Sequence, residues 1–118
     1  MSDCIFCKIA SGEIETDKVY EDERIIAFKD MEPQAPVHIL VIPKHHIESL
    51  DDVKAGDAPL IGDLMCKIKG IAKEAGIENG YRVVNNCGEN GFQTVKHIHF
   101  HLLGNKRMGW PPYTEIEG

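Results

Sequence analysis

The run His97-Ile98-His99-Phe100-His101-Leu102-Leu103 constrains this chain more than any other stretch of its 118 residues. Histidine and apolar residues alternate strictly, and a period of two is the period of a β-strand. We therefore expect a strand over residues 97–103. Its histidines share one face at a spacing of about 6–7 Å, and its apolar residues share the other face, where they can pack on a helix.

A row of three imidazoles on one face is suited to nucleophilic chemistry. The pKa of imidazole lies near 6.5, so the neutral, nucleophilic form is present at physiological pH. His99 has a histidine on each side, and a neighbour that holds one ring nitrogen as a donor leaves the lone pair of the other nitrogen free. His99 is therefore the candidate nucleophile. A three-histidine metal site and a merely solvated sheet face are the alternative interpretations.

The rest of the chain alternates between strands, one long helix and turns. The helix is expected from about Pro59 to Ala75, where apolar residues recur with helical spacing; Pro59 suits its first turn and Gly76 its end. A short helical segment is expected at residues 4–10, and further strands at 18–20, 24–28, 37–42 and 81–85. This order predicts an α+β fold, an antiparallel sheet of about five strands with one long helix on one face.

Length and charge narrow the class of protein. A chain of 118 residues is expected to form a single domain over residues 1–118. The net charge of −6 disfavours a nucleic-acid partner, although local donors can still bind one small phosphate ligand. The apolar runs are too short to span a membrane and the first residues lack the pattern of a signal peptide, so we expect a cytoplasmic protein without a membrane partner.

Cys4 and Cys7 have a Cys-x-x-Cys spacing, which is typical of a zinc site or of redox chemistry. A zinc site needs two further ligands. A reduced pair of buried thiols and a redox dithiol are the alternatives. Cys66 lies near the apolar stripe of the long helix and is expected in the core, and Cys87 falls in a loop without an assigned role.

Several segments together resemble the histidine triad (HIT) family. The segments that accompany the histidine run are Cys4–Ile9, Ala27–Asp30, Pro33–His38, Val41–Lys44 and Trp110–Pro112. They cover nearly the whole chain and resemble the nucleoside phosphoramidase branch. The resemblance implies a HIT-like fold that pairs into a homodimer. It also implies hydrolysis of purine nucleoside 5'-phosphoramidates through a nucleotidyl-histidine intermediate on His99.

Three other functions remain open at this point. Within the superfamily, the chain would instead hydrolyse dinucleoside polyphosphates or transfer nucleotidyl groups. Outside enzymes, it would be a nucleotide-binding or zinc-binding adaptor. A redox protein built on Cys4 and Cys7 is the third.

The resemblance also assigns roles to single residues. His101 would hydrogen-bond a phosphate oxygen, and His38 would support the histidine row from the neighbouring strand. Asp30 would accept hydrogen bonds from the ribose hydroxyls. Gln93 and Thr94 would donate to the phosphate or the bridging atom, and Asn86, with Asn85 as the rival register, would also contact the ligand. The base would lie among Ile5, Phe6, Phe28 and Met31, and Trp110 would reach toward the active site of the partner subunit. For Ile5 and Phe28, plain core packing is the alternative.

The same resemblance completes the zinc site with Cys4, Cys7, His46 and His97. Four such ligands leave no open position, so the zinc would be structural and would orient the strand that carries His99. His45 is the rival of His46. The chain departs from the family pattern at Phe92, where a second glycine is common, and at Lys96 and Tyr113, and these departures bear on the leaving-group pocket and the substrate.

Overall fold

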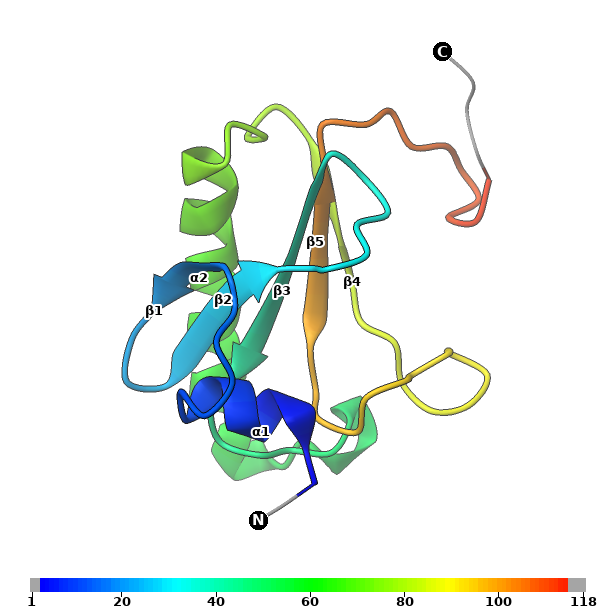
Figure 1. Ribbon diagram of the computed structural model, residues 1–118. Coiled ribbons are helices and arrows are strands. Elements are labelled where there is room, and N and C mark those ends of the chain that lie inside the picture. The colour runs from blue at the N-terminus through cyan, green and yellow to red at the C-terminus, as the bar shows by residue number, and fades with distance from the viewer. Residues whose placement is uncertain (1–2, 115–118) are drawn as a thin grey trace.

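The computed structural model describes residues 3–114 as one five-stranded antiparallel sheet with a helix on each face (Figure 1). The strand order is β1-β2-β3-β5-β4, which confirms the predicted α+β architecture. The strands are β1 (Lys18–Glu21), β2 (Ile25–Lys29), β3 (Val37–Pro43), β4 (Tyr81–Val84) and β5 (Phe100–Gly104), and the helices are α1 (Ile5–Ala10) and α2 (Ala58–Glu74). Within residues 3–114, no helix has the length and apolar character that crossing a bilayer requires.

Helix α2 covers one face of the sheet, behind it in Figure 1. The apolar stripe predicted from the sequence is buried at Leu64, Ile68 and Ile71. These side chains share a core with Ile98 and Leu102 and with the odd-numbered residues of β2 and β3. The apolar side of the histidine run therefore packs beneath the helix, as predicted.

Helix α1 covers the opposite face. Phe6 and Ile9 form a second core with Phe28, Leu40 and other even-numbered residues of β2 and β3. Leu40 and His101 are directly opposite each other in the β3–β5 ladder, so their side chains lie on the same face of the sheet. The histidines therefore lie on the α1 face, and alternation along each strand separates them from the α2 core.

The predicted strand over 97–103 is wrong at its start, because β5 begins only at Phe100. The neighbouring strand β3 ends at Pro43, which has no backbone N–H with which to continue a ladder. Ile98 N–H instead donates to the Ile47 carbonyl at 2.7 Å, and the Asn85 side-chain amide donates to the His99 carbonyl at 2.9 Å. The alternation of faces persists through this irregular segment.

The other elements agree with the prediction within one or two residues. Helix α2 spans Ala58–Glu74 where 59–75 was predicted, and Gly76 follows it with a φ of +78°, the left-handed geometry of a helix stop. Two single turns of 3₁₀-helix, Leu50–Asp52 and Ala55–Asp57, were not predicted.

Candidate active site and metal site

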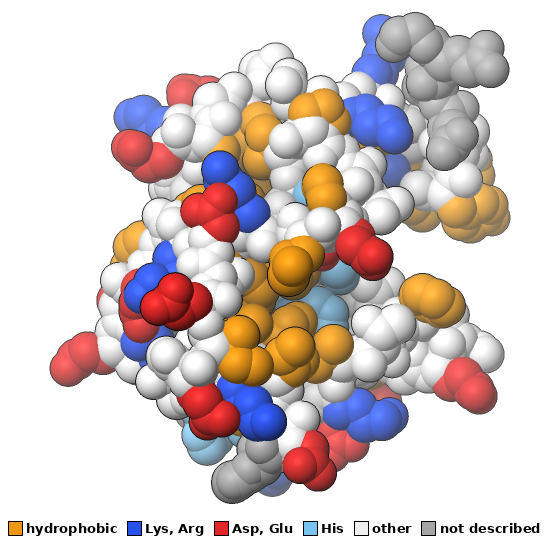
Figure 2. All heavy atoms as spheres, in the orientation of Figure 1, with side chains coloured by type: hydrophobic (Ala, Val, Ile, Leu, Met, Phe, Trp, Pro, Cys, Tyr) orange, Lys and Arg blue, Asp and Glu red, His pale blue; other side chains and the backbone are white. Residues whose placement is uncertain are grey.

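The histidine row is a buried feature. The exposed fractions of His97 and His99 are 0% and 3%, and His38 is also buried. Figure 2 shows histidine side chains at the bottom of a hollow on the α1 face, with hydrophobic side chains around it. A solvated sheet face is therefore excluded as an explanation of the row.

His99 has a defined tautomer. Its Nδ1 lies 2.8 Å from the backbone carbonyl oxygen of His97, which can only accept a hydrogen bond. Nδ1 therefore carries the proton, and Nε2 keeps its lone pair. Burial lowers the pKa of His99 below its ordinary value, which keeps the ring neutral at physiological pH.

A second chain of hydrogen bonds fixes His38 and His101. The Gln34 backbone N–H donates to His38 Nδ1 at 2.9 Å, so the proton of His38 is on Nε2. His38 Nε2–H then donates to His101 Nδ1 at 2.8 Å, which leaves the proton of His101 on its Nε2. His101 thus offers one N–H donor beside the lone pair of His99, at a ring centroid distance of 5.1 Å.

The surroundings of His101 keep it neutral. Burial, with further contributions from His99 and His38, lowers the pKa of His101 to about 4. The Asp30 carboxylate acts in the opposite direction, and its Oδ2 lies 3.4 Å from His38 Nε2. Asp30, His38 and His101 lie close enough together to suggest a metal site, but the proton on His38 Nε2 occupies the position that a metal would need.

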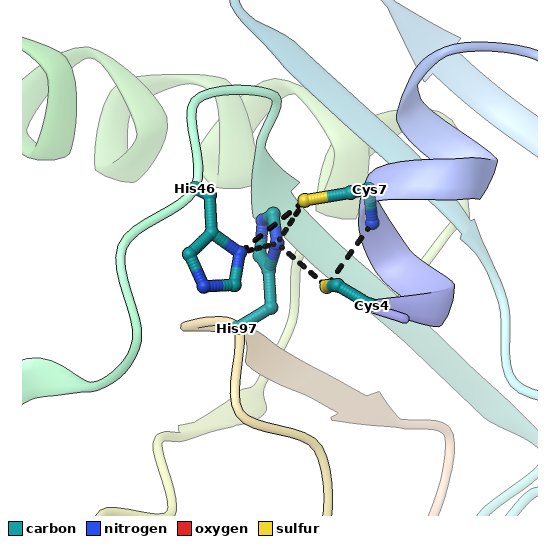
Figure 3. Close-up of side chains that lie close together, drawn as sticks. All are labelled: Cys4, Cys7, His46 and His97. Carbon is teal, nitrogen blue, oxygen red and sulfur yellow. Dashed lines mark hydrogen bonds between the residues drawn. The ribbon is translucent and has the colours of Figure 1, made fainter. Parts of the chain in front are cut away.

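The second site is formed by Cys4, Cys7, His46 and His97 (Figure 3). His97 Nδ1 lies 3.3 Å from Cys4 Sγ and 3.5 Å from Cys7 Sγ. His46 Nδ1 lies 3.2 Å from Cys7 Sγ and 3.1 Å from His97 Nδ1. Two ligands of a tetrahedral zinc ion are separated by ~3.5 Å for sulfur and nitrogen and by ~3.3 Å for two nitrogens, so these four distances match the spacing of zinc ligands.

The protonation states of these donors also fit a metal. His97 Nε2–H donates to the Pro43 carbonyl at 2.8 Å, so the lone pair of Nδ1 points at the cysteines. Burial lowers the pKa of His97 to about 4, which keeps that lone pair free. Burial and the adjacent Cys4 raise the pKa of Cys7 to about 11, so the Cys7 thiol needs a nearby cation to lose its proton at neutral pH.

Local structure explains why these four residues meet. Cys4 caps the N-terminus of α1, where its Sγ accepts the Cys7 N–H at 3.3 Å. One turn of α1 therefore brings both thiols to one end of the helix. The structure brings the four predicted ligands within reach of one ion, and His45, Cys66 and Cys87 lie outside the cluster. The expectation that Cys66 lies in the core is wrong, because its side of α2 is exposed.

His97 connects the two sites. Its ring belongs to the metal site, and its backbone carbonyl accepts the proton of the candidate nucleophile. Phe6, between the two cysteines in the sequence, packs edge-on against both His97 and His99, at centroid distances of 6.0 and 5.1 Å. A single metal ion held by all three histidines is thereby contradicted. The free Nδ1 of His97 faces the two cysteines, whereas Nδ1 of His99 is bonded to the His97 carbonyl and its lone pair is on Nε2.

The residues predicted to bind the base divide into two groups. Phe6 and Phe28 are buried and pack edge-to-face at 5.6 Å, as members of the α1 core. Ile5 and Met31 are exposed, and Met31 has 93% of its surface free. Phe28 is therefore a core residue, as the alternative interpretation of the sequence held. Ile5 and Met31, by contrast, have exposed surface that a ligand can contact.

Three residues predicted to contact the ligand, Asn86, Gln93 and Thr94, lie in the loop between β4 and β5. The Gln93 amide already donates to the carbonyls of Glu48 and Val95, and the Asn86 amide donates to the Gly91 carbonyl. Both side chains hold the loop rather than point freely at the hollow. Thr94 is exposed.

Asn85 contributes to the site in a way that the sequence interpretation missed. Its amide holds the His99 carbonyl, and its buried Oδ1 has no hydrogen-bond partner among the described residues. The only feature of the sequence that pointed to a role for Asn85 was its position at the end of a predicted strand, beside Asn86.

Trp110 lies near Arg82 of the outer strand β4. It is 79% exposed, and the Arg82 guanidinium lies 6.0 Å from the ring centroid. Arg82 also donates to the carbonyls of Gly109 and Pro112, which attaches the tail to the outer strand β4.

A separate cavity of ≈ 870 Å³ opens between α2 and strands β1 to β3. Its floor includes Val37, Ile39 and Ile71, which belong to the α2 face, and Asp30 and His38 border it. None of the three histidines of the row lines this cavity, so the candidate active site is the hollow on the α1 face.

Fold, histidine row and metal site together define a class of protein. The sequence profile described as "Scavenger mRNA decapping enzyme C-term binding" matches residues 3–110. Curated relatives about half identical over most of the chain are HIT-like proteins. The chain belongs to the histidine triad family.

Three relatives illustrate the similarity. An uncharacterized HIT-like protein of Synechococcus elongatus is 51% identical over 110 residues, covering 93% of this chain and 96% of its own length. The 14 kDa zinc-binding protein of Zea mays is 48% identical over 113 residues, covering 94% and 88%. The crystal structure of a HIT family hydrolase from Legionella pneumophila superimposes with a TM-score of 0.91 at 48% identity, covering 93% and 99%.

Proposed function

We propose that this protein hydrolyses purine nucleoside 5'-phosphoramidates through a covalent nucleotidyl intermediate on His99. The observation that carries the proposal is the hydrogen bond from His99 Nδ1 to the His97 carbonyl, because it leaves a buried, neutral Nε2 with a free lone pair. The histidine triad family includes solved structures titled as hydrolases, which supports a hydrolytic reaction.

In the first step, His99 Nε2 attacks the α-phosphorus and the phosphorus–nitrogen bond of the substrate breaks. The amine takes up a proton from solvent as it leaves. In the second step, water attacks the phosphorus, releases the nucleoside monophosphate and restores the neutral imidazole. The net reaction adds the hydrogen of water to the nitrogen and its hydroxyl to the phosphorus.

The surrounding residues stabilise charge as it develops. The phosphorylated His99 ring becomes cationic, and the His97 carbonyl accepts its Nδ1–H throughout. His101 Nε2–H, fixed by the hydrogen bond from His38, is the donor for a phosphate oxygen. A donor that is oriented before the reaction loses no free energy to reorganisation at the transition state.

The nucleoside would bind on the α1 side of the hollow. Asp30 would accept the ribose hydroxyls, and the base would lie on the exposed Ile5 and Met31, with the buried rings of Phe6 and Phe28 beneath as core. Thr94, whose side chain is exposed, would supply a hydroxyl to the phosphate. Asn86 and Gln93 would act by holding their loop, since their amides are already engaged.

A structural zinc ion would be held by Cys4, Cys7, His46 and His97. A relative is named for zinc binding, and the donor spacing supports the same metal here. With four protein ligands the ion supplies rigidity and no open coordination position. The His97 ring is then held on one side by the metal site and on the other by the Pro43 carbonyl. A fixed His97 keeps its own backbone carbonyl in the position that orients His99.

A homodimer would complete the assembly. Strand β4 is an outer strand of the sheet, and its Tyr81 and Val83 side chains are exposed. An unpaired, apolar strand edge is suited to pairing with a second copy. The exposed Trp110 would then reach the active site of the partner subunit.

The experiment compares the wild-type protein with a His99→Ala variant on two substrates, adenosine 5'-phosphoramidate and diadenosine tetraphosphate. His45→Ala is the matched control, because His45 is an exposed histidine outside both sites. We expect the wild type and His45→Ala to cleave the phosphoramidate preferentially, and mass spectrometry of acid-sensitive adducts to place the nucleotide on His99.

Three results would contradict the proposal. Preferential cleavage of the tetraphosphate would favour a polyphosphate hydrolase. Unchanged turnover by His99→Ala would exclude His99 as the nucleophile. Tight binding of the monophosphate without turnover by the wild type would favour an adaptor.

A further inference from the structure

The cavity between α2 and strands β1 to β3 lies outside the proposed active site. Its volume is ≈ 870 Å³, which falls within the range of pockets that bind small molecules, about 300–1,000 Å³. It opens on the α2 face of the sheet, the side away from the hollow that holds the histidine row (Figure 1). The proposed hydrolysis gives this space no role.

Gly70 keeps the helix side of the cavity open. It lies in the interior of α2, where glycine is less favourable than alanine because it loses more conformational freedom on folding. It lines the cavity, and a Cβ added there would meet no atom within 4 Å. A larger side chain at this position would therefore take up part of the space that the glycine leaves.

The walls of the cavity carry apolar side chains that the fold leaves partly uncovered. Val19 of β1 is 39% exposed, and Val37 of β3 is half-buried. Pro33 and Pro36, in the loop between β2 and β3, are exposed, and the buried Ile71 of α2 closes the floor. These side chains come from separate elements and converge on one space, so an apolar ligand would remove water from all of them at once.

Lysine side chains border the cavity from both layers. Lys29 belongs to β2, and Lys67 and Lys73 belong to α2. Lys67 is paired with Asp63 at 3.2 Å. Lys29 lies 3.7 Å from Asp17, in a pair whose side chains are both exposed, and Lys73 has no ion pair within residues 3–114. Exposed pairs contribute little, so Lys29 and Lys73 offer ammonium groups to an anionic ligand.

Two carboxylates also border the cavity, and one of them is engaged. Asp30 Oδ1 accepts the Glu32 N–H at 2.7 Å, and Asp30 Oδ2 lies 3.4 Å from His38 Nε2. Glu74 is exposed near the end of α2. The lining thus carries three lysines against two carboxylates, in a chain whose net charge is −6. This local excess of positive charge favours an anionic head group over a cationic one.

We propose that this cavity binds an amphipathic monocarboxylate, with its hydrocarbon chain on the apolar walls and its carboxylate at Lys29 and Lys73. Such a ligand matches both features of the lining, because its chain covers the exposed apolar side chains while its head group stays at the solvent-exposed rim. The inference does not rest on the reaction proposed for His99, since no residue of α2 takes part in that reaction.

The test measures binding of octanoate and octylamine to the full chain by isothermal titration calorimetry. The two probes share the same hydrocarbon chain and differ in the charge of the head group. Chemical shifts of the backbone amides, followed by ¹⁵N NMR during the titration, locate the site. Tm and molar mass by light scattering are measured for each variant.

Two pairs of variants separate the walls from the rim. Gly70→Leu fills the cavity from the helix side. Gly62→Leu is its control, because Gly62 lies in the same helix, also meets open space and does not line the cavity. Lys73→Gln removes an ammonium group from the rim, and Lys69→Gln, at an exposed position of the same helix outside the lining, is its control.

We expect octanoate to bind the wild type and both controls, and to shift the amide signals of Val19, Val37 and Gly70. Octylamine should bind about 2- to 5-fold more weakly, and Lys73→Gln should weaken octanoate by a similar factor. Gly70→Leu should weaken it by about 10-fold or more, because each methylene kept off the apolar walls costs about 4-fold. Its Tm should not fall, because leucine is the better helix former.

The proposal is overturned if octanoate shows no saturable binding to the wild type, or if Gly70→Leu binds it as tightly as Gly62→Leu. Amide shifts confined to α1 and the histidine segment would overturn it too. Equal affinity for the two probes, or equal effects of Lys73→Gln and Lys69→Gln, would overturn the choice of a carboxylate. A change of molar mass in Gly70→Leu alone would show that a second copy of the chain covers this face instead. If Gly70→Leu fails to fold, the amide shifts and the Lys73→Gln comparison still decide.

Discussion

Removing one thiol of the metal site tests the coupling between the two sites. In a Cys7→Ser variant, the zinc tetrahedron loses one of its four donors, and the neighbouring His97 loses its restraint on one side. A ligand that binds only the folded state stabilises it by RT ln(1 + [L]/Kd), which is about 4 kcal/mol when the free zinc concentration is 1,000 times Kd. For a domain of this size, such a loss lowers Tm by roughly 12–20 °C.

The assay measures zinc per chain by mass spectrometry, Tm by calorimetry, and the His99 tautomer by ¹⁵N NMR. Cys66→Ser is the matched control, since Cys66 is an exposed cysteine outside the metal site. We expect about one zinc per chain in the wild type and in the control, and almost none in Cys7→Ser. The NMR signals of His99 should then show a mixture of tautomers, because the His97 carbonyl is no longer held in place.

Equal zinc content and equal Tm in Cys7→Ser and Cys66→Ser would refute the metal site. Loss of zinc with an unchanged His99 tautomer would refute the coupling alone, and would show that the Pro43 hydrogen bond is sufficient to hold His97.

Three further predictions concern stability and the histidine relay. Gly104→Ala should lower the free energy of unfolding by about 1–3 kcal/mol in urea titrations, because the new Cβ would lie 2.6 Å from Ile77 Cδ1. Gly62→Ala is the control and should not lower it, because its new Cβ meets open space. His38→Phe should reduce kcat/KM by roughly 10- to 100-fold at unchanged zinc content, because the donor that orients His101 is lost. The pKa of His101 is about 4 when folded and near 6.5 when unfolded, so its contribution to stability is full above pH 6.5. It is lost as pH falls toward 4, by up to about 3 kcal/mol, and the pH dependence of unfolding should be shallower in His101→Asn.

The histidine run and the helical stripe were interpretable from sequence because both depend on local periodicity. Alternation separates His99 from Ile98 whatever the rest of the chain does, and helical spacing predicts α2 almost to the residue. The start of β5 could not be predicted in this way. It depends on Pro43 ending the neighbouring strand and on Asn85 and Ile47 satisfying the backbone groups of 98–99.

The sequence by itself determined the fold class, the candidate nucleophile and the types of metal ligand, because those follow from residue identity and spacing. Only the tertiary structure decided which nitrogen of each imidazole carries a proton. For His97 and His101 that choice depends on residues distant in the chain, because the Pro43 carbonyl fixes the proton of His97 and the His38 ring fixes that of His101. The tertiary structure also decided that His97 serves both sites. Its ring reaches the two cysteines and its carbonyl reaches His99 only because α1, β3 and the histidine segment are packed together.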